Sequence, residues 1–315
     1  MLKVNDLTAL RGEKVHGYLS VKDEEKAIPI TLISGKNEGK CLVITAGVHG
    51  GEYAGIEAAI RFMQELDPAK MAGDVIIISP ANLSGFFATL HSIVAVDGKN
   101  LNRCFPGDAE GSYTEQLAHA ISSKVFPLAD LYLDLHCGDL HEGATPYAYI
   151  PLDCAPEVTS ASFAASEVLN IRYRRPSLGT GNSYASAAKL GVPSILLERA
   201  GRGIWEEADV KAFLQDLRSM AIYLGILQGE VERHPMMDLV KEVDARTQTE
   251  GLWYPMVNPG DEIRKGQKLG ELRDVFGNVL QEPTAQGDGA VLYTKCTLAI
   301  RKGGLMVCYG LREDG

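Results

Sequence analysis

Short apolar runs alternate with longer amphipathic segments along the first 230 residues. The runs are rich in β-branched residues and end in glycine or polar residues, as buried strands do. The longer segments repeat apolar residues every three or four positions, which is typical of helices with one buried face. Strands of this kind separated by helices predict a largely parallel sheet covered on both faces. The expected strands are 40–48, 74–82, 129–138 and 192–201, and the expected helices include 52–66 and 113–126.

The pattern changes after residue 230. Residues 231–250 are polar and are interpreted as a connector. From Gly251 onward, short β-prone pieces are interrupted by NPGD, KGQ, FGN, QGDG and KGG, and turn signals at this density predict a small all-β module. Because single cores stop growing at roughly 250 to 300 residues, we expect a large domain over residues 1–230, the connector over 231–250, and the module over 251–315.

Composition narrows the classes of protein and partner. Of the 315 residues, 45% are hydrophobic and 23% are charged, and no uncharged apolar run is long enough to span a bilayer. A formal net charge of -10 argues against a nucleic-acid surface. Six cysteines without a CxxC pair suit free thiols in a reducing compartment, and the N-terminal segment lacks the apolar stretch of a signal peptide. We expect a cytoplasmic protein with a small-molecule partner, no nucleic-acid partner and no membrane partner; self-association into a homo-oligomer is left open.

Ionisable residues follow or close three of the expected strands. His49 and Glu52 follow the first run, His136 closes the third and Glu198 closes the fourth. In open parallel sheets, ligands bind beyond the carboxyl ends of the strands. These four side chains are therefore expected to converge on one rim of the sheet.

The His49–Glu52 pair suits a metal site. A catalytic zinc typically takes three ligands of His, Asp or Glu type and leaves a fourth position open. Positions i and i+3 lie on the same side of a helical turn, and His136 is the candidate for the third ligand. By itself an HxxE pair is more often a polar surface turn. Its position at a strand end among glycines, together with the later DLH and LLE sequences, favours the metal site.

Four motifs in a fixed order carry a family resemblance. They are GVHGGEYAG (47–55), DGKNLNRCFPG (97–107), YLDLHCG (132–138) and SILLERAG (194–201), followed by the glycine-punctuated β module. Together they resemble the succinylglutamate desuccinylase/aspartoacylase family of zinc carboxypeptidase-like hydrolases. The resemblance implies an α/β fold with a mostly parallel mixed sheet flanked by helices, and a small C-terminal all-β domain of barrel-sandwich type.

The resemblance also implies a cofactor and a substrate grip. It implies one zinc ion per chain, held by His49, Glu52 and His136. It places Asn102 and Arg103 where the carboxylate of the substrate binds. This role is chemically sensible, because a guanidinium matches a carboxylate with two parallel hydrogen bonds and an amide adds a further donor.

Glu198 is implied as the catalytic carboxylate. Beside zinc it can take a proton from the attacking water and deliver it to the leaving amine. The alternative is a structural ion pair with Arg199 or Arg202, because such pairs also place carboxylates at strand ends. Asp134 precedes His136 by two residues on a strand, faces the same way, and is expected to orient that histidine.

Two positions depart from the family pattern. His91 occupies the place of an arginine that stabilises the developing oxyanion, so His91 is the candidate for that catalytic role. Asn100 occupies the place of an aspartate that supports the first zinc histidine, and a neutral amide raises ligand basicity less than a carboxylate does. These two departures bear on the rate and the substrate rather than on the three metal ligands.

The β module resembles domains that carry biotin or lipoate, but neither Lys268 nor Lys295 lies in an attachment motif with flanking methionines at a hairpin tip. We interpret the module as structural, shaping or shielding the mouth of the site. Tyr254 and Tyr293 are its candidates to reach the substrate.

Three functions are compatible with these residues. The favoured one is a zinc-dependent deacylase that cleaves the amide bond of a small N-acylated amino acid or amine, since the module would narrow access to small substrates. The second is a zinc carboxypeptidase acting on short peptides with the same metal, base and carboxylate grip. The third is a catalytically weak metal-binding or ligand-sensing relative, which the two departures make conceivable.

Overall fold

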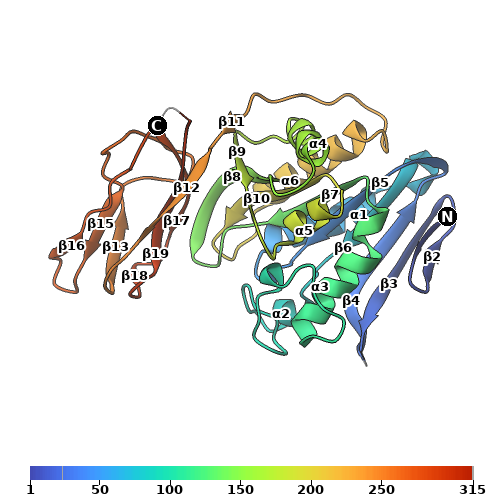
Figure 1. Ribbon diagram of the computed structural model, residues 1–315, viewed down its shortest axis with the longest axis horizontal. Coiled ribbons are helices and arrows are strands. Elements are labelled where there is room, and N and C mark those ends of the chain that lie inside the picture. The colour runs from blue at the N-terminus through green and yellow to red at the C-terminus, as the bar shows by residue number, and fades with distance from the viewer. Residues whose placement is uncertain (23, 314–315) are drawn as a thin grey trace.

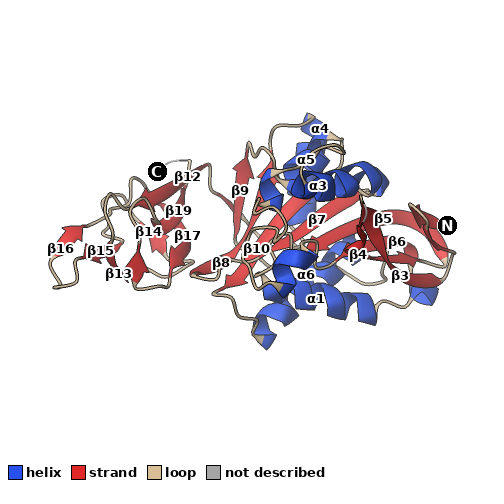
Figure 2. Cartoon of the chain, turned by 90° about the horizontal axis from the view of Figure 1, so that it is seen from below, coloured by secondary structure: helices blue, strands red, loops and turns tan. Residues whose placement is uncertain are grey.

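The computed structural model of the chain describes residues 1–22 and 24–313 (Figure 1). A large twisted sheet runs through the chain, and helices cover both faces of its N-terminal part (Figure 2). One face carries α1 (Tyr53–Glu65) and α6 (Glu207–Tyr223). The other face carries α3 (Tyr113–Lys124), α4 (Pro156–Ser166) and α5 (Ser183–Lys189). The predicted α/β fold class is confirmed.

Four parallel strands form the centre of the sheet in the order β10-β7-β5-β6. Each of them coincides with a strand that the apolar runs predict, and the two helices named from the sequence are confirmed as α1 and α3. The bounds of the central strands are Asn37–Ala46 for β5, Ala72–Ile78 for β6, Leu131–His136 for β7 and Ser194–Gly201 for β10.

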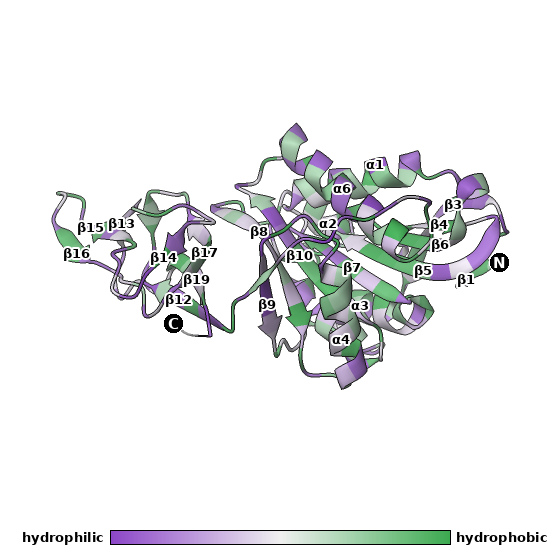
Figure 3. Ribbon diagram, turned by 90° about the horizontal axis from the view of Figure 1, so that it is seen from above, coloured by the Kyte–Doolittle hydropathy of each residue, from purple (hydrophilic) through white to green (hydrophobic). Residues whose placement is uncertain are grey.

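Successive side chains of the central strands enter two different cores. Ile44 of β5 belongs to the same buried cluster as Phe62 of α1. Its neighbour Val43 belongs to the cluster that holds Leu117 of α3. Figure 3 shows hydrophobic and hydrophilic residues side by side on α1, as expected for a helix with one buried face. Burial on both faces explains why β5 is a continuous apolar run in the sequence.

Antiparallel strands extend the sheet on both sides of its parallel centre. On one side β4 (Glu24–Ser34) joins β6 to β3 (Glu13–Val21). On the other side β8 (Glu142–Pro151) runs antiparallel to β10, and β9 (Tyr173–Ser177) runs parallel to β8. A separate hairpin contains β1 (Leu2–Val4) and β2 (Leu7–Ala9), and short helical turns are α2 (Leu83–Phe87), η1 (Pro68–Lys70), η2 (Leu101–Arg103) and η3 (Phe126–Leu128).

The C-terminal module packs two groups of strands around Trp253, Met306 and Tyr309. A small sheet has the order β16-β15-β13-β18, while β17 and β19 extend the large sheet because β17 pairs with β8. The module is thus joined to the large domain by strand pairing. Its strands are β13 (Gly251–Pro255), β14 (Glu262–Ile263), β15 (Gly270–Arg273), β16 (Val279–Gln281), β17 (Gly289–Lys295), β18 (Ala299–Ile300) and β19 (Leu305–Leu311).

Residues 231–250, which their polar composition suggests are a connector, also form strands. They contain β11 (Met237–Asp238) and β12 (Lys241–Arg246). β12 pairs with β19 and buries Val243, whereas Glu242 lines the cavity described below. A strand with this alternation carries too few apolar residues to stand out in the sequence.

Two further findings concern the described residues. None of their helices combines the length and the apolar character needed to cross a bilayer. Their six cysteines are free, as the sequence predicts.

Candidate active site

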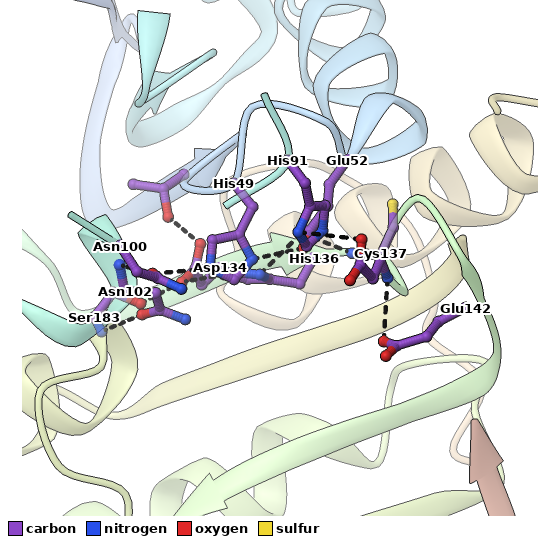
Figure 4. A network of polar contacts seen from close by, with 12 residues as sticks. His49, Glu52, His91, Asn100, Asn102, Asp134, His136, Cys137, Glu142 and Ser183 are labelled. Carbon is purple, nitrogen blue, oxygen red and sulfur yellow. Dashed lines mark hydrogen bonds and ion pairs between the residues drawn. The ribbon is translucent and has the colours of Figure 1, made fainter. Parts of the chain in front are cut away.

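The predicted site residues line one cavity at the carboxyl ends of the central strands. Figure 4 shows those of them that surround Glu52. His49 lies in the turn between β5 and α1, and Glu52 is the residue that precedes α1. His136 ends β7 and is directly opposite Glu198 of β10 in the parallel register. The turn passes so close to α2 that a Cβ on Gly50 would lie 2.5 Å from the backbone nitrogen of Phe86. Glycine at position 50 therefore permits this approach.

The Glu52 carboxylate is the centre of the cluster. Its Oε1 lies 2.6 Å from Nδ1 of His49, and its Oε2 lies 2.9 Å from Nδ1 of His136. The backbone N–H of Cys137 donates to Oε2 at 2.9 Å. Burial alone would raise the pKa of Glu52, but the facing His136 and His49 outweigh burial and hold this pKa well below its usual range. Glu52 is thus an ionised carboxylate between two imidazoles.

An oxygen atom faces the far nitrogen of each imidazole. Nε2 of His49 lies 3.2 Å from Oδ1 of Asn100, which also accepts from the backbone N–H of Asn102. Nε2 of His136 lies 3.0 Å from Oδ2 of Asp134. Because Asn100 Oδ1 and a carboxylate act as acceptors here, both Nε2 atoms carry protons. Both Nδ1 atoms are then directed at Glu52.

This arrangement fits a divalent metal ion. With Nε2 protonated, Nδ1 faces the negative carboxylate either with a second proton, as the raised pKa of His136 beside Asp134 and Glu52 favours for that ring, or with a lone pair that needs a cation between the two groups. Two imidazole nitrogens and one carboxylate also form the kind of donor set that a catalytic zinc takes, with a further position open. His49, Glu52 and His136 therefore suit zinc, and Asn100 and Asp134 orient the two histidines as metal-site acceptors do.

His91, predicted to stabilise the oxyanion, also lies close to the Glu52 carboxylate. Its Nε2 is 3.4 Å from Oε1 of Glu52, and its Nδ1 is 3.3 Å from Oδ1 of Asp139. Ligand atoms of His49, Glu52 and His91 lie within 4.8 Å of one another. Nε2 of His91 is buried and has no hydrogen-bond partner among the described residues. Burial opposes a charge on this ring, but Glu52 and Asp139 outweigh burial and raise the pKa of His91.

Glu198 is half-buried and has neither of the partners that a structural ion pair would require. Arg199 pairs instead with Asp216 at 2.6 Å, and Arg202 pairs with Glu206 at 3.7 Å. Burial, reinforced by nearby carboxylates and opposed by His136, raises the pKa of Glu198 well above its usual range. A carboxyl group whose pKa is raised holds a proton more readily than an ordinary one and can pass it to a leaving group.

Asn102 and Arg103 lie on η2 at the edge of the same cavity. Asn102 is buried and its Oδ1 accepts from the backbone N–H of Ser183 at 3.0 Å. Arg103 is exposed, and its Nη1 donates to the backbone oxygen of Asn102 at 2.7 Å. The guanidinium retains further donors for a carboxylate.

These side chains line a cavity of about 420 Å³. Tyr293 of β17 is part of its lining, so the C-terminal module contributes to the site as predicted.

Tyr254, the other tyrosine expected to reach the substrate, is outside this lining, and Arg273 lies over its ring at 4.6 Å from the centroid. Lys295 forms ion pairs with Asp139 at 3.4 Å and with Glu142 at 3.0 Å. Sequence reasoning missed several lining residues outside the four motifs, among them Tyr147, Tyr149, Arg175, Tyr184 and Glu242.

Comparison with known proteins agrees with this geometry. A sequence model of the succinylglutamate desuccinylase/aspartoacylase catalytic domain matches residues 38–224. The chain is 28% identical to an N-alpha-acetyl-L-2,4-diaminobutyric acid deacetylase from Halomonas elongata, over 91% of this chain and 89% of the relative. The product-bound structure of the ectoine utilization protein EutE (DoeB) from Ruegeria pomeroyi is similar, with a TM-score of 0.86, 25% identity and 97% of each chain covered. A succinylglutamate desuccinylase/aspartoacylase structure from Rhodobacter sphaeroides, 23% identical, shares the fold with a TM-score of 0.85 over 96% of each chain.

Proposed function

The chain belongs to the succinylglutamate desuccinylase/aspartoacylase family, and from this premise we propose that it is a zinc-dependent deacylase of small N-acylated amino acids. The family and the curated relative support a hydrolase that acts on amide bonds. One observation carries the proposal for this chain. The Nδ1 atoms of His49 and His136 converge on the two oxygens of Glu52 inside a cavity that also contains Glu198 and Arg103.

The proposed zinc ligands are His49, Glu52 and His136. When bound, zinc would polarise the amide carbonyl and lower the pKa of a water molecule at the site. Asn100 and Asp134 accept from the Nε2 atoms and keep the Nδ1 atoms available.

Proton transfer is assigned to Glu198. As a carboxylate it takes a proton from the attacking water, and as a carboxylic acid it gives that proton to the leaving nitrogen. A raised pKa suits the second step, because it helps the carboxyl group to keep the proton until the nitrogen leaves. His91 is assigned a hydrogen bond to the carbonyl oxygen on which negative charge develops.

The substrate carboxylate is assigned to Arg103, with Asn102 beside it. A cavity of about 420 Å³ to which the C-terminal module contributes suits a small substrate better than a peptide. Because the Halomonas elongata relative is named as a deacetylase of an N-acetyl amino acid, N-acetyl amino acids are the first substrates to assay. These features favour the deacylase over the carboxypeptidase.

A hydrolysis screen tests the proposal. Zinc-loaded protein is incubated with N-acetyl and N-succinyl amino acids and with short peptides, and the free amine is measured. We expect turnover of at least one N-acyl amino acid and little turnover of peptides. Glu157, an acidic residue in the first turn of α4, provides a control: Glu157→Gln should match the wild type. Preferential cleavage of peptides, or no hydrolysis of any N-acyl amino acid, would contradict the proposal.

A further inference from the structure

Ser183, the first residue of α5, lies in the polar network of the site but has no role in the steps above (Figure 4). Its side chain is completely buried, although serine is usually exposed. The hydroxyl group of Ser183 donates to Oδ2 of Asp134, and the backbone N–H of the same residue donates to Oδ1 of Asn102 at 3.0 Å. Asp134 contacts the proposed metal ligand His136, whereas Asn102 lies beside Arg103. One residue thus contacts both halves of the site.

Both oxygens of the Asp134 carboxylate are held by hydroxyl groups. Oδ1 accepts from Oγ1 of Thr45 at 2.6 Å, and Oδ2 accepts from Ser183 as well as from Nε2 of His136 at 3.0 Å. Because the single proton of the Thr45 hydroxyl is used for Asp134, the hydroxyl of Tyr132 donates to Thr45 at 2.5 Å. Asp134, Thr45 and Ser183 are completely buried. A carboxylate that is shielded from solvent is stabilised and directed by the groups that donate to it, so these hydroxyl groups determine how Asp134 faces His136.

The contact with Ser183 also determines which end of the Asn102 amide faces the cavity. A backbone N–H can only donate, so the atom of Asn102 that it contacts is the amide oxygen. Since Asn102 belongs to the lining of the cavity, its NH₂ group is the donor that it offers to a substrate carboxylate held by Arg103. The loop before Ser183 is packed tightly against the same motif, because a Cβ on Gly181 would lie 2.8 Å from the backbone oxygen of Arg103.

We propose that Ser183 is a positioning residue for both the metal and the substrate. Its hydroxyl group fixes Asp134 and thereby the direction of the His136 imidazole. Its backbone N–H fixes the amide of Asn102 so that the NH₂ group meets the substrate carboxylate. The part that concerns the metal rests on the proposed zinc site, and the part that concerns the carboxylate rests on the proposed deacylase function.

Zinc affinity, measured by competition with a chelator, tests the role of the hydroxyl group. Ser183→Ala removes one oxygen atom and lets Asp134 turn away from His136, so the affinity should fall about three- to tenfold, less than for a direct partner of a metal ligand. Ser183→Thr keeps the hydroxyl group and should retain the wild-type affinity. Ser186→Ala is the control, because Ser186 lies on the same helix and outside the cavity lining. An affinity of Ser183→Ala equal to or higher than that of the wild type would overturn this role.

A double-mutant cycle shows whether Ser183 acts through Asp134. Asp134→Asn should itself lower the zinc affinity about 10- to 100-fold, because an amide is a weaker acceptor for the imidazole than a carboxylate. In this background Ser183→Ala should change the affinity less than about twofold, since the group on which Ser183 acts is already altered. Losses that multiply in the double variant would mean that Ser183→Ala perturbs the structure generally, and would overturn the inference.

Michaelis constants at saturating zinc test the role of the backbone N–H. Proline is tolerated at the first residue of a helix, and Asn182, with φ of -90° and ψ of 152°, has the extended conformation that a following proline requires. Ser183→Pro removes the N–H and should raise KM for an N-acetyl amino acid about tenfold, whereas Ser183→Ala should leave KM unchanged. Asn102→Ala removes the amide without altering α5 and should raise KM by a similar factor. An unchanged KM in Asn102→Ala would overturn the role of this amide.

The two kinds of measurement separate this inference from the proposed function. Chelator competition needs no substrate, so a lower zinc affinity of Ser183→Ala supports the role of the hydroxyl group even when no N-acyl amino acid is hydrolysed. Hydrolysis of N-acetyl amino acids by the wild type, together with equal zinc affinities of the wild type and Ser183→Ala, would overturn the inference and leave the deacylase intact.

Discussion

Nδ1 of His136 lies 2.9 Å from Oε2 of Glu52, although one residue ends β7 and the other precedes α1. The contact exists because β5 and β7 are adjacent parallel strands, so that the residues following both strands reach the same rim. His49 approaches the other oxygen of the same carboxylate. The proposed metal site is thus a direct product of the strand order.

Zinc content should depend on these three side chains. We expect the reconstituted protein to bind about one zinc per chain, as an open three-ligand site does. His49→Ala, Glu52→Ala and His136→Ala should each lose most of the metal, measured by elemental analysis after dialysis. His119→Ala, on α3, is the control and should retain it. A triple variant that still binds one zinc would show that the metal lies elsewhere.

Asn100 should tune the affinity for zinc. It accepts from Nε2 of His49 without carrying a charge. Asn100→Asp should raise the affinity, because a carboxylate makes the imidazole more basic, while Asn100→Ala should lower it by about 10- to 100-fold. Competition with a chelator measures both. An unchanged affinity in both variants would mean that this hydrogen bond does not affect the metal.

Glu198→Gln should separate metal binding from catalysis. Glutamine cannot exchange a proton, so we expect zinc to stay bound and kcat to fall by about 10² or more. In the wild type, kcat/KM should rise with pH as Glu198 loses its proton, and its raised pKa should place this rise above the usual pH range of a carboxyl group. A pH profile from 5 to 8 measures the effect. Activity in Glu198→Gln equal to that of the wild type would remove Glu198 from the mechanism.

The buried pair of Arg199 and Asp216 gives a prediction of stability. Both side chains are buried and their atoms Nη2 and Oδ2 are 2.6 Å apart. Asp216→Ala leaves a buried, unpaired guanidinium and should lower the free energy of unfolding by about 3 to 5 kcal/mol. The control is Glu65→Ala, because Glu65 pairs with Arg218 at the surface, where such pairs contribute at most about 1 kcal/mol. Urea denaturation compares the two variants, and equal losses would contradict the prediction.

The sequence predicted best those strands whose residues are apolar throughout because both of their faces are buried. Continuous apolar runs predicted β5 and β10 because both faces of these strands are buried, and their polar ends predicted the positions of Glu52 and Glu198. β12 was missed because Glu242 and Asp244 give it the composition of a connector. No local pattern links Glu242 to Tyr149, since their contact arises from pairing between the module and the large domain.

The position of His91 is compatible with two roles, that of a hydrogen-bond donor and that of a metal ligand. Its Nε2 is 3.4 Å from Oε1 of Glu52 and can serve as a donor to the carbonyl oxygen or as a fourth metal ligand. The distinction matters because a donor acts on the transition state, whereas a ligand acts on metal affinity. Asp139, which lies 3.3 Å from Nδ1, favours the donor because a nearby carboxylate stabilises the protonated ring.

We therefore predict that His91→Ala keeps its zinc and lowers kcat by about 10² to 10³ with little change in KM, which is the usual loss when one oxyanion donor is removed. His91→Arg should retain or improve activity, because a guanidinium is always charged and donates in the same region. Histidine becomes less charged as pH rises, so the advantage of wild type over His91→Ala should shrink above the pKa of His91, whereas His91→Arg should stay active. Zinc content and kcat are measured on the same preparations from pH 6 to 8. If His91→Ala loses as much zinc as His49→Ala, His91 is a ligand and a different group must stabilise the charge on the carbonyl oxygen.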